Sequence, residues 1–282
     1  MAPDQIDKRT ILITGCSSGI GHFTAHALHE RGYRVFATAR KAADVERLQT
    51  EGLESLPLDL DDSASIEAAV TELLARTGNR LDAVFHNGAY GQPGAVEDLG
   101  RDVLRRQFET NLFGWHDLNN RILPVMRAQG HGRIIYNSSV LGFVAMRFRG
   151  AYNASKYALE GLTDTQRLEL RGTGIHISLI QPGPITSQFR QNAFAAYKAN
   201  INPDNSADRD AYRRMEERLE KAGPAVPFTL GPEAVLKRVI HALESPRPKH
   251  RYAVTVPTYA FAFLKRVLPG RWLDRLLAKA GG

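Results

Sequence analysis

The sequence predicts a single α/β domain built on a doubly wound parallel sheet of seven strands, with helices on both faces. Short β-branched and apolar runs alternate with helical patterns along residues 10–256, which is typical of successive βαβ units. Several runs are apolar throughout, as expected for strands that are buried on both faces. A chain of 282 residues is long enough to form one such sheet with a sizeable core.

The apolar runs define the expected strands, which are Thr10–Thr14, Arg34–Thr38, Leu56–Leu58, Ala83–His86, Arg133–Tyr136, Ile175–Ile180 and Tyr252–Val256. The helical patterns between them are His22–Arg31, Ser63–Arg76, Asp102–Gln129, Ala154–Arg171 and Glu233–Leu243. Pro232 suits the first turn of the last helix, where an N–H group has no partner within the helix.

Residues 186–231 interrupt the alternation because they are long, polar and irregular, with Asn202-Pro203-Asp204-Asn205 inside and Gly223-Pro224 near the end. A connection of this length in a compact domain is usually a functional insertion. We expect a lid over a substrate; a surface excursion is the alternative.

The composition excludes several classes of protein. With 43% hydrophobic and 24% charged residues the chain is an ordinary globular protein. A lone cysteine, Cys16, rules out a disulfide framework and a multi-cysteine metal site, and we expect no metal. The first ten residues have no apolar segment of a secretory signal, and no apolar run reaches the roughly 18 residues of a spanning helix. We therefore expect a cytoplasmic protein.

A glycine-rich loop follows the first expected strand and opens a helix. Residues 14–21 read Thr-Gly-Cys-Ser-Ser-Gly-Ile-Gly, with the spacing Gly-x-x-x-Gly-x-Gly. Glycines there allow a backbone to approach a pyrophosphate closely, and the helix N-terminus supplies free N–H groups. The loop predicts a dinucleotide site whose contacts come from Gly15, Ser17, Ser18, Gly19, Ile20 and Gly21.

The end of the second expected strand predicts which dinucleotide binds. An acid about 20 residues after such a loop binds the ribose hydroxyls of NAD. Here the strand ends at Arg40, whose guanidinium suits bidentate contact with a 2′-phosphate, and Ser17 offers a second hydrogen bond. We predict NADP(H) over NAD(H); the alternative is a solvated surface arginine.

Tyr152 and Lys156 place a phenol and an ammonium four residues apart on one helix face, thirteen residues after Ser139. A nearby cation favours the phenolate, so we expect Lys156 and a positive nicotinamide ring to lower the pKa of Tyr152 and make it a base near neutral pH. Ser139 would hydrogen-bond the substrate oxygen.

These motifs resemble the short-chain dehydrogenase/reductase family, from Thr10 to about Val256. The resemblance implies a Rossmann-type fold, hydride transfer, and catalysis by Asn111, Ser139, Tyr152 and Lys156. It also implies that the cofactor contacts Asp59, Leu60, Asn87, Gly88, Ala89, Tyr152, Lys156, Pro182, Gly183, Ile185 and Ser187. Two departures concern the family's Asn-Asn-Ala-Gly segment, which reads His86-Asn87-Gly88-Ala89, and its Pro-Gly-x-x-x-Thr threonine, which is Ser187.

Within the family the chain is most similar to the 17β-hydroxysteroid and retinol dehydrogenase-like branch, on three strings: residues 13–21, 35–40 and 157–162. We therefore expect a secondary alcohol, ketone or aldehyde on a bulky hydrophobic substrate, held by Ser139, Leu141, Phe143, Phe148, Tyr152 and Phe189. Arg147 and Arg149 could meet an anionic tail of the substrate, but we interpret both as solvent-exposed. A regulatory NADP(H)-binding protein without turnover, or an epimerase on the same scaffold, are the alternatives.

The formal net charge of +7 belongs to the C-terminal segment. Residues 247–282 hold eight basic side chains and one acid, whereas residues 1–246 hold 29 of each sign. This argues against a nucleic-acid-binding face. We divide the chain into a catalytic domain, residues 1–256, and a basic amphipathic extension, residues 257–282, broken by Pro257 and Pro269. The extension would dock on the pocket rim or a partner subunit, or lie on a membrane surface. The family resemblance also implies a homodimer or homotetramer.

Overall fold

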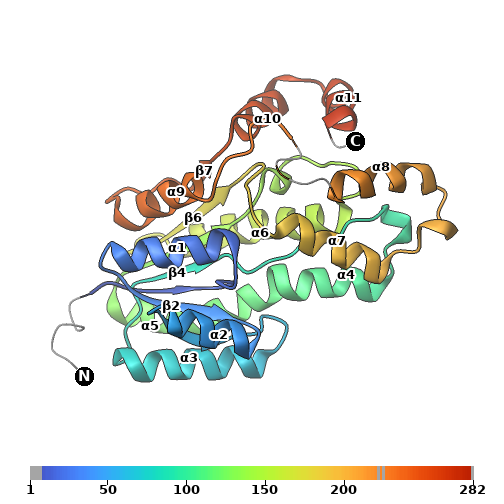
Figure 1. Cartoon of the computed structure of the whole chain (residues 1–282). Coiled ribbons are helices and arrows are strands. Elements are labelled where there is room, and N and C mark those ends of the chain that lie inside the picture. Colours follow the sequence, from blue (N-terminus) through green and yellow to red (C-terminus); the bar gives the residue numbers. More distant parts are fainter. Residues whose placement is uncertain (1–7, 221–222, 224–225, 281–282) are drawn as a thin grey trace.

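The computed structural model describes residues 8–220, 223 and 226–280, and it confirms the predicted doubly wound sheet (Figure 1). The strands are β1 (Thr10–Ile13), β2 (Arg34–Ala39), β3 (Glu54–Pro57), β4 (Ala83–His86), β5 (Gly132–Asn137), β6 (Ile175–Gln181) and β7 (Arg251–Ala253). They pair in parallel in the order β3-β2-β1-β4-β5-β6-β7. The order reverses between β1 and β4, and in such sheets the carboxyl ends of the strands at the reversal form the ligand crevice.

Helices cover the two faces of the sheet, as Figure 1 shows for α1 and α9 on one side and α3 and α5 on the other. The first face packs against α1 (Gly19–Glu30), α2 (Ala42–Thr50) and α9 (Glu233–Glu244), and the second against α3 (Ser63–Thr77), α5 (Gly114–Gln129) and α6 (Gly150–Glu169). Ile11 and Leu12 of β1 belong to opposite cores because successive strand residues point to opposite faces. Both cores are thus built from adjacent residues of the same strands.

The structure differs from the expected helices in two places. The helix expected over Asp102–Gln129 is α4 (Arg101–Phe108), a π-helical segment η3 (Glu109–Phe113) and α5. Helix α2 was not expected, because it is short and polar and buries only Val45 and Leu48. The remaining strands and helices match the expected ones to within about three residues at each end, apart from α6, which begins four residues earlier.

The expectation of an irregular segment over residues 186–231 was wrong. It contains α7 (Phe189–Asn200), a 3₁₀ turn η5 (Pro203–Asn205) and α8 (Arg209–Glu220). Tyr212, Met215 and Leu219 share one face of α8 because they lie three and four residues apart, and they pack with Tyr197 of α7 in a small separate core. The high charge density of α8 hides this apolar face in the sequence. Residues 221, 222, 224 and 225 of the segment lie outside the described residues.

The C-terminal segment forms α10 (Val256–Val267) and α11 (Gly270–Ala280), drawn in red in Figure 1. The helices are separated at Leu268-Pro269, and α10 already begins at Val256, one residue before the predicted boundary. Phe261, Leu273 and Leu277 pack against Val140, Phe143 and Val144 of the loop after β5. Within the described part of the chain, the helices are too short or too polar to cross a bilayer.

Candidate active site

The predicted catalytic residues meet where β5 ends and α6 begins. Ser139 lies two residues after β5, and its hydroxyl accepts a hydrogen bond from the Leu141 N–H (3.1 Å), which starts the short 3₁₀ turn η4 (Val140–Gly142). Tyr152 and Lys156 lie on the first two turns of α6 and are 8% and 0% exposed. The structure therefore brings together the serine, phenol and ammonium that the sequence predicted.

Burial, and not the lysine, dominates the acidity of Tyr152. Desolvation raises the pKa of the phenol well above its usual value, and a hydrogen bond with Ser139 partly offsets this rise. The sequence predicted the opposite direction. The difference arises because the phenol is buried and the Lys156 ammonium is itself desolvated. The neutral phenol is the form that can donate a proton.

Lys156 is held by backbone and by an aromatic ring. Its Nζ donates to the Asn137 carbonyl oxygen (2.8 Å) and lies 4.3 Å from the centre of the Trp115 ring, a cation–π contact. Burial lowers the pKa of Lys156 to about 7, and the Glu160 carboxylate partly offsets this. At neutral pH the charged and neutral forms of the Lys156 side chain are therefore both populated.

Sequence reasoning missed Asn137 and Thr14, which connect the lysine to the glycine loop. Asn137 Nδ2 donates to Asn87 Oδ1 (3.0 Å), and Asn87 Nδ2 donates to the carbonyl oxygens of Thr14 and Gly15 (3.2 Å each). The Thr14 hydroxyl accepts from the N–H groups of Asn87 and Gly88 (2.9 Å each). The available signal was position: Thr14 and Asn137 are polar residues at carboxyl ends of parallel strands.

Asn111 lies in the π-helical segment η3 and is fully buried. Its Nδ2 donates to the Tyr90 carbonyl oxygen (2.9 Å) and to Ser155 Oγ (3.2 Å), and its Oδ1 accepts from the Tyr90 N–H (3.2 Å). A π-helical turn inserts one residue into a helix and is frequent at functional sites. Here it turns the Asn111 amide towards α6 and anchors the Tyr90 backbone.

The glycine loop fits a dinucleotide phosphate. Helix α1 begins at Gly19, and the side chain of its N-cap residue, Ser18, makes no capping hydrogen bond, so the first-turn N–H groups are available to an anion. A side chain at Gly15 would lie 2.5 Å from the Gly88 Cα, so the loop and the segment after β4 touch backbone to backbone. Gly21 is equally required, because its Cβ would lie 2.2 Å from the Gly15 oxygen.

The other predicted cofactor residues surround this loop. Ser187 packs against Gly19, whose Cβ would lie 3.1 Å from the Ser187 Cβ, and Leu60 packs against Gly88. The Pro182 carbonyl oxygen accepts from the Val140 N–H (2.8 Å), and Ile185 packs on the α1 face of the sheet. Ile20 lies in the first turn of α1, and Arg40, Asp59, Ala89 and Gly183 follow the carboxyl ends of β2, β3, β4 and β6.

A cavity of about 150 Å³ opens beside Tyr152. It is lined by Gly91, Pro93, Leu141, Arg149, Tyr152, Phe189, Arg190, Ala193 and Leu219. The Phe189 ring meets Tyr152 edge-on at 5.3 Å between ring centres. Phe189, Arg190 and Ala193 belong to α7 and Leu219 belongs to α8, so these two helices form one wall of the cavity.

Three expectations about this cavity need correction. Among its described lining residues are Leu141 and Phe189, but not Phe143 or Phe148: Phe143 packs under α10 and α11, and Phe148 packs on Tyr212. Arg149, interpreted as solvent-exposed, lines the cavity, whereas Arg147 is 52% exposed and pairs with Asp208. The apolar residues of the loop after β5 predicted contact with the substrate. The backbone of this loop instead directs Phe143 towards α10 and α11 and Phe148 towards Tyr212.

Comparisons with known proteins identify the family of this chain. The family model of the short chain dehydrogenases matches residues 9–198. The uncharacterized oxidoreductase YbbO of Escherichia coli (strain K12) is 43% identical over 97% of this chain and 95% of that protein. Human 17-beta-hydroxysteroid dehydrogenase type 1 is 31% identical over 88% of this chain and 78% of that protein, and human retinol dehydrogenase 8 is 30% identical over 92% and 85%.

Solved structures share the fold. A short-chain dehydrogenase from Streptomyces avermitilis superposes with a TM-score of 0.77 at 26% identity, covering 95% of this chain and 94% of that one. Two more distant structures contain different cofactors: one from Burkholderia phymatum holds NAD (TM-score 0.78, 22% identity, 93% and 94% covered), and one from Burkholderia cenocepacia holds NADP (0.74, 20%, 97% and 99%). The chain therefore belongs to the short-chain dehydrogenase/reductase family, on the branch of the 17β-hydroxysteroid and retinol dehydrogenases, and is an oxidoreductase of alcohol and ketone groups.

Proposed function

We propose that the protein is an NADP(H)-dependent oxidoreductase that interconverts a secondary alcohol and a ketone, or an aldehyde, on a bulky hydrophobic substrate. The observation that carries the proposal is the Tyr152 phenol at the wall of the cavity, with Ser139 and Lys156 beside it. A regulatory protein without turnover has no need of this arrangement. A cytoplasmic location remains a prediction.

In reduction, Tyr152 donates its proton to the carbonyl oxygen of the substrate, and the Ser139 hydroxyl hydrogen-bonds the same oxygen and positions it. The raised pKa of Tyr152 keeps the phenol protonated and supports this direction. Tyr152 and Lys156 would hold the nicotinamide ribose, and the residues around the glycine loop would hold the phosphates. The dinucleotide, when bound, supplies or accepts the hydride.

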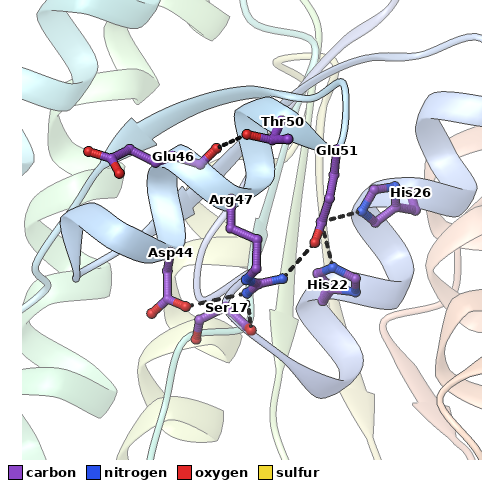
Figure 2. Close-up of polar contacts among 8 residues, drawn as sticks. All are labelled: Ser17, His22, His26, Asp44, Glu46, Arg47, Thr50 and Glu51. Atoms are coloured by element: carbon purple, nitrogen blue, oxygen red, sulfur yellow. Dashed lines mark hydrogen bonds and ion pairs between the residues drawn. The ribbon is translucent and has the colours of Figure 1, made fainter.

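The NADP(H) preference rests on the charges at the end of β2. Arg40 is exposed, Lys41 follows it, and no described carboxylate pairs with Arg40. Arg47 of α2 also lies at this edge, where its Nη2 donates to the Ser17 carbonyl oxygen (2.6 Å; Figure 2), but its charge is already paired with Asp44 and Glu51. A 2′-phosphate would meet positive charge here, whereas the ribose hydroxyls of NAD would find no acid.

The C-terminal helices have two different faces. The inner face packs on the loop after Ser139, and Lys265 Nζ donates to the Phe143 carbonyl oxygen (2.6 Å). The outer face exposes Phe263 (64%) and Trp272 (60%) beside basic side chains. We propose that the inner face supports the pocket rim and that the outer face rests on an anionic membrane surface, since it combines apolar and basic groups.

We also propose that two or four copies associate through α4, α5 and α6. These helices expose large apolar side chains at Leu104, Phe113, Tyr157, Leu162 and Leu168. Such a row is unusual on the surface of a monomer and supports a self-association surface.

Replacing Arg40→Asp should reverse the cofactor preference. Loss of charge-assisted hydrogen bonds to the 2′-phosphate costs roughly 10- to 100-fold in kcat/KM for NADPH, and the new carboxylate favours NADH. Steady-state kinetics with both cofactors measures the ratio, with Arg80→Asp, at the opposite edge of the sheet, as the control. A ratio that stays at the wild-type value contradicts the NADP(H) assignment.

Tyr152→Phe should abolish turnover and weaken NADPH binding by no more than about tenfold, because the substitution removes the proton donor and one hydrogen bond to the ribose. The measurements are NADPH oxidation with a panel of ketones and aldehydes, and NADPH binding by fluorescence. Retained turnover in the variant would show that another group exchanges the proton.

Wild-type protein should sediment with vesicles that contain phosphatidylserine and not with pure phosphatidylcholine vesicles. The double variant Phe263→Glu/Trp272→Glu should lose most of this binding, and so should removal of residues 258–282. Val96→Glu, which alters an apolar side chain of 74% exposure away from the tail, is the matched control. Equal sedimentation of wild type and double variant argues against the membrane surface.

A further inference from the structure

Arg149 is the N-cap residue of α6 and precedes Tyr152, the proposed proton donor, by three positions. Both line the same cavity. An arginine side chain there therefore reaches a substrate whose carbonyl group meets Tyr152.

The backbone around Arg149 is held in a costly conformation. Phe148 has a φ of 57°, in the left-handed region that a bulky side chain rarely adopts. It is kept there by the Gly94 N–H, which donates to the Phe148 carbonyl oxygen (3.2 Å), and by a β-bridge between Gly94 and Arg149. Backbone strain of this kind concentrates at functional sites, and here it fixes the starting direction of the Arg149 side chain.

The partners of Arg149 do not neutralise its charge. Nη1 donates to the Phe148 carbonyl oxygen (3.1 Å) and contacts Met215 Sδ (3.6 Å), and no described carboxylate pairs with the guanidinium. Two further arginines lie nearby: Arg190 lines the same cavity, and the charge of Arg218 adds to burial in lowering the pKa of Arg149 to about 9. A bound anion would supply the counter-charge that the partly buried Arg149 guanidinium does not find among the described carboxylates.

From this arrangement we propose that the substrate carries a carboxylate, bound by Arg149, close to the carbonyl group that Tyr152 protonates. The guanidinium fork matches a carboxylate in two parallel hydrogen bonds. Leu141, Phe189 and Leu219 supply apolar walls for the carbon skeleton between the two groups. The inference rests on the proposed function and narrows it to oxo- or hydroxy-carboxylic acids with an apolar body.

The test compares 4-carboxybenzaldehyde with the neutral and nearly isosteric 4-nitrobenzaldehyde, at saturating NADPH. We compare the ratio of kcat/KM for 4-carboxybenzaldehyde to kcat/KM for 4-nitrobenzaldehyde. This ratio should be roughly 10- to 100-fold lower in Arg149→Met than in wild type. Most of the change should lie in KM. Arg147→Met, which removes an exposed arginine two residues away, should leave the ratio unchanged. An Arg149→Met ratio equal to wild type, or an equal loss in Arg147→Met, overturns the proposal.

Binding of benzoate, followed by calorimetry in the absence of turnover, separates this inference from the proposed function. Benzoate should bind wild type more tightly than benzamide and lose that advantage in Arg149→Met. If the neutral aldehyde is turned over and Arg149→Met does not change the kcat/KM ratio of the two aldehydes, the carboxylate proposal is rejected and the oxidoreductase function stands. If neither aldehyde is turned over, benzoate binding by wild type and by Arg149→Met alone decides the anion site.

A second site lies on the opposite side of the glycine loop, and a different observation carries it. His22 and His26, one turn apart on α1, direct both Nε2 atoms at one carboxylate oxygen of Glu51 (2.8 and 2.9 Å; Figure 2). The three ligand atoms lie within 4.8 Å of one another, and each side chain is about 30% exposed. Two imidazoles one turn apart and a carboxylate are a ligand set that Zn²⁺ prefers.

The Glu51 carboxylate is oriented by Arg47, which contacts the oxygen that does not face the two histidines. This oxygen accepts from Arg47 Nη1 (2.8 Å), and Arg47 is fixed in turn by Asp44 and by the Ser17 carbonyl oxygen. Outer contacts of this kind orient metal ligands. We infer that His22, His26 and Glu51 bind a divalent transition-metal ion such as Zn²⁺, with water completing the coordination, and that the ion links α1 to the end of α2.

Untagged protein should bind one Zn²⁺ per chain in calorimetry, and Co²⁺ should give visible absorption of a low-symmetry site. His22→Gln, His26→Gln and Glu51→Gln should each weaken binding by more than about tenfold. His29→Gln, on the next turn of α1, is the matched control and should bind as wild type does. Absence of binding, or binding that survives the first three substitutions, rejects the site.

Discussion

The chain of hydrogen bonds from Lys156 through Asn137 and Asn87 to Thr14 is the contact on which the rest of the site depends. It joins the ends of β5, β4 and β1, which are neighbours in the sheet only because the strand order reverses between β1 and β4. Every link ends on backbone or on a short amide, so the positions of the lysine and the glycine loop are fixed relative to each other. The sheet topology thereby sets the distance between proton exchange and cofactor phosphate.

Burial gives these groups their chemistry. Lys156 is fully buried, and no described carboxylate is in hydrogen-bond contact with it, so desolvation lowers its pKa to about 7. Desolvation also raises the pKa of the Tyr152 phenol and so keeps it protonated. The Trp115 ring and the Asn137 carbonyl stabilise the ammonium without neutralising it. A bound cofactor adds polar ribose hydroxyls beside these two groups, so the same pocket would then favour the charged lysine.

The sequence predicted the sheet, the glycine loop and the Ser139, Tyr152 and Lys156 site because these depend on local patterns: apolar runs, glycine spacing and a four-residue helical repeat. It did not predict η3, α2, α7 or α8. A π-helical turn has no separate spacing signal, and in α8 the four buried residues are surrounded by charges. The position of Arg149 was also missed, since it depends on a positive φ at Phe148 and on pairing with Gly94, far away in the sequence.

The cavity and the C-terminal helices share one wall. Leu141 faces the cavity, while Phe143, two residues later, packs under α10 and α11. Asn153 of α6 holds this loop through the carbonyl oxygens of Leu141 and Val144 (2.9 and 2.8 Å), and Lys265 holds it from the other side at Phe143. At about 150 Å³ the cavity is smaller than the 300–1,000 Å³ of typical ligand sites, so a bulky substrate requires α7 and α8 or this wall to move. Since the wall is fixed on one side by α6, which carries Tyr152, and on the other by α10 and α11, a movement of these C-terminal helices would displace Leu141 at the cavity.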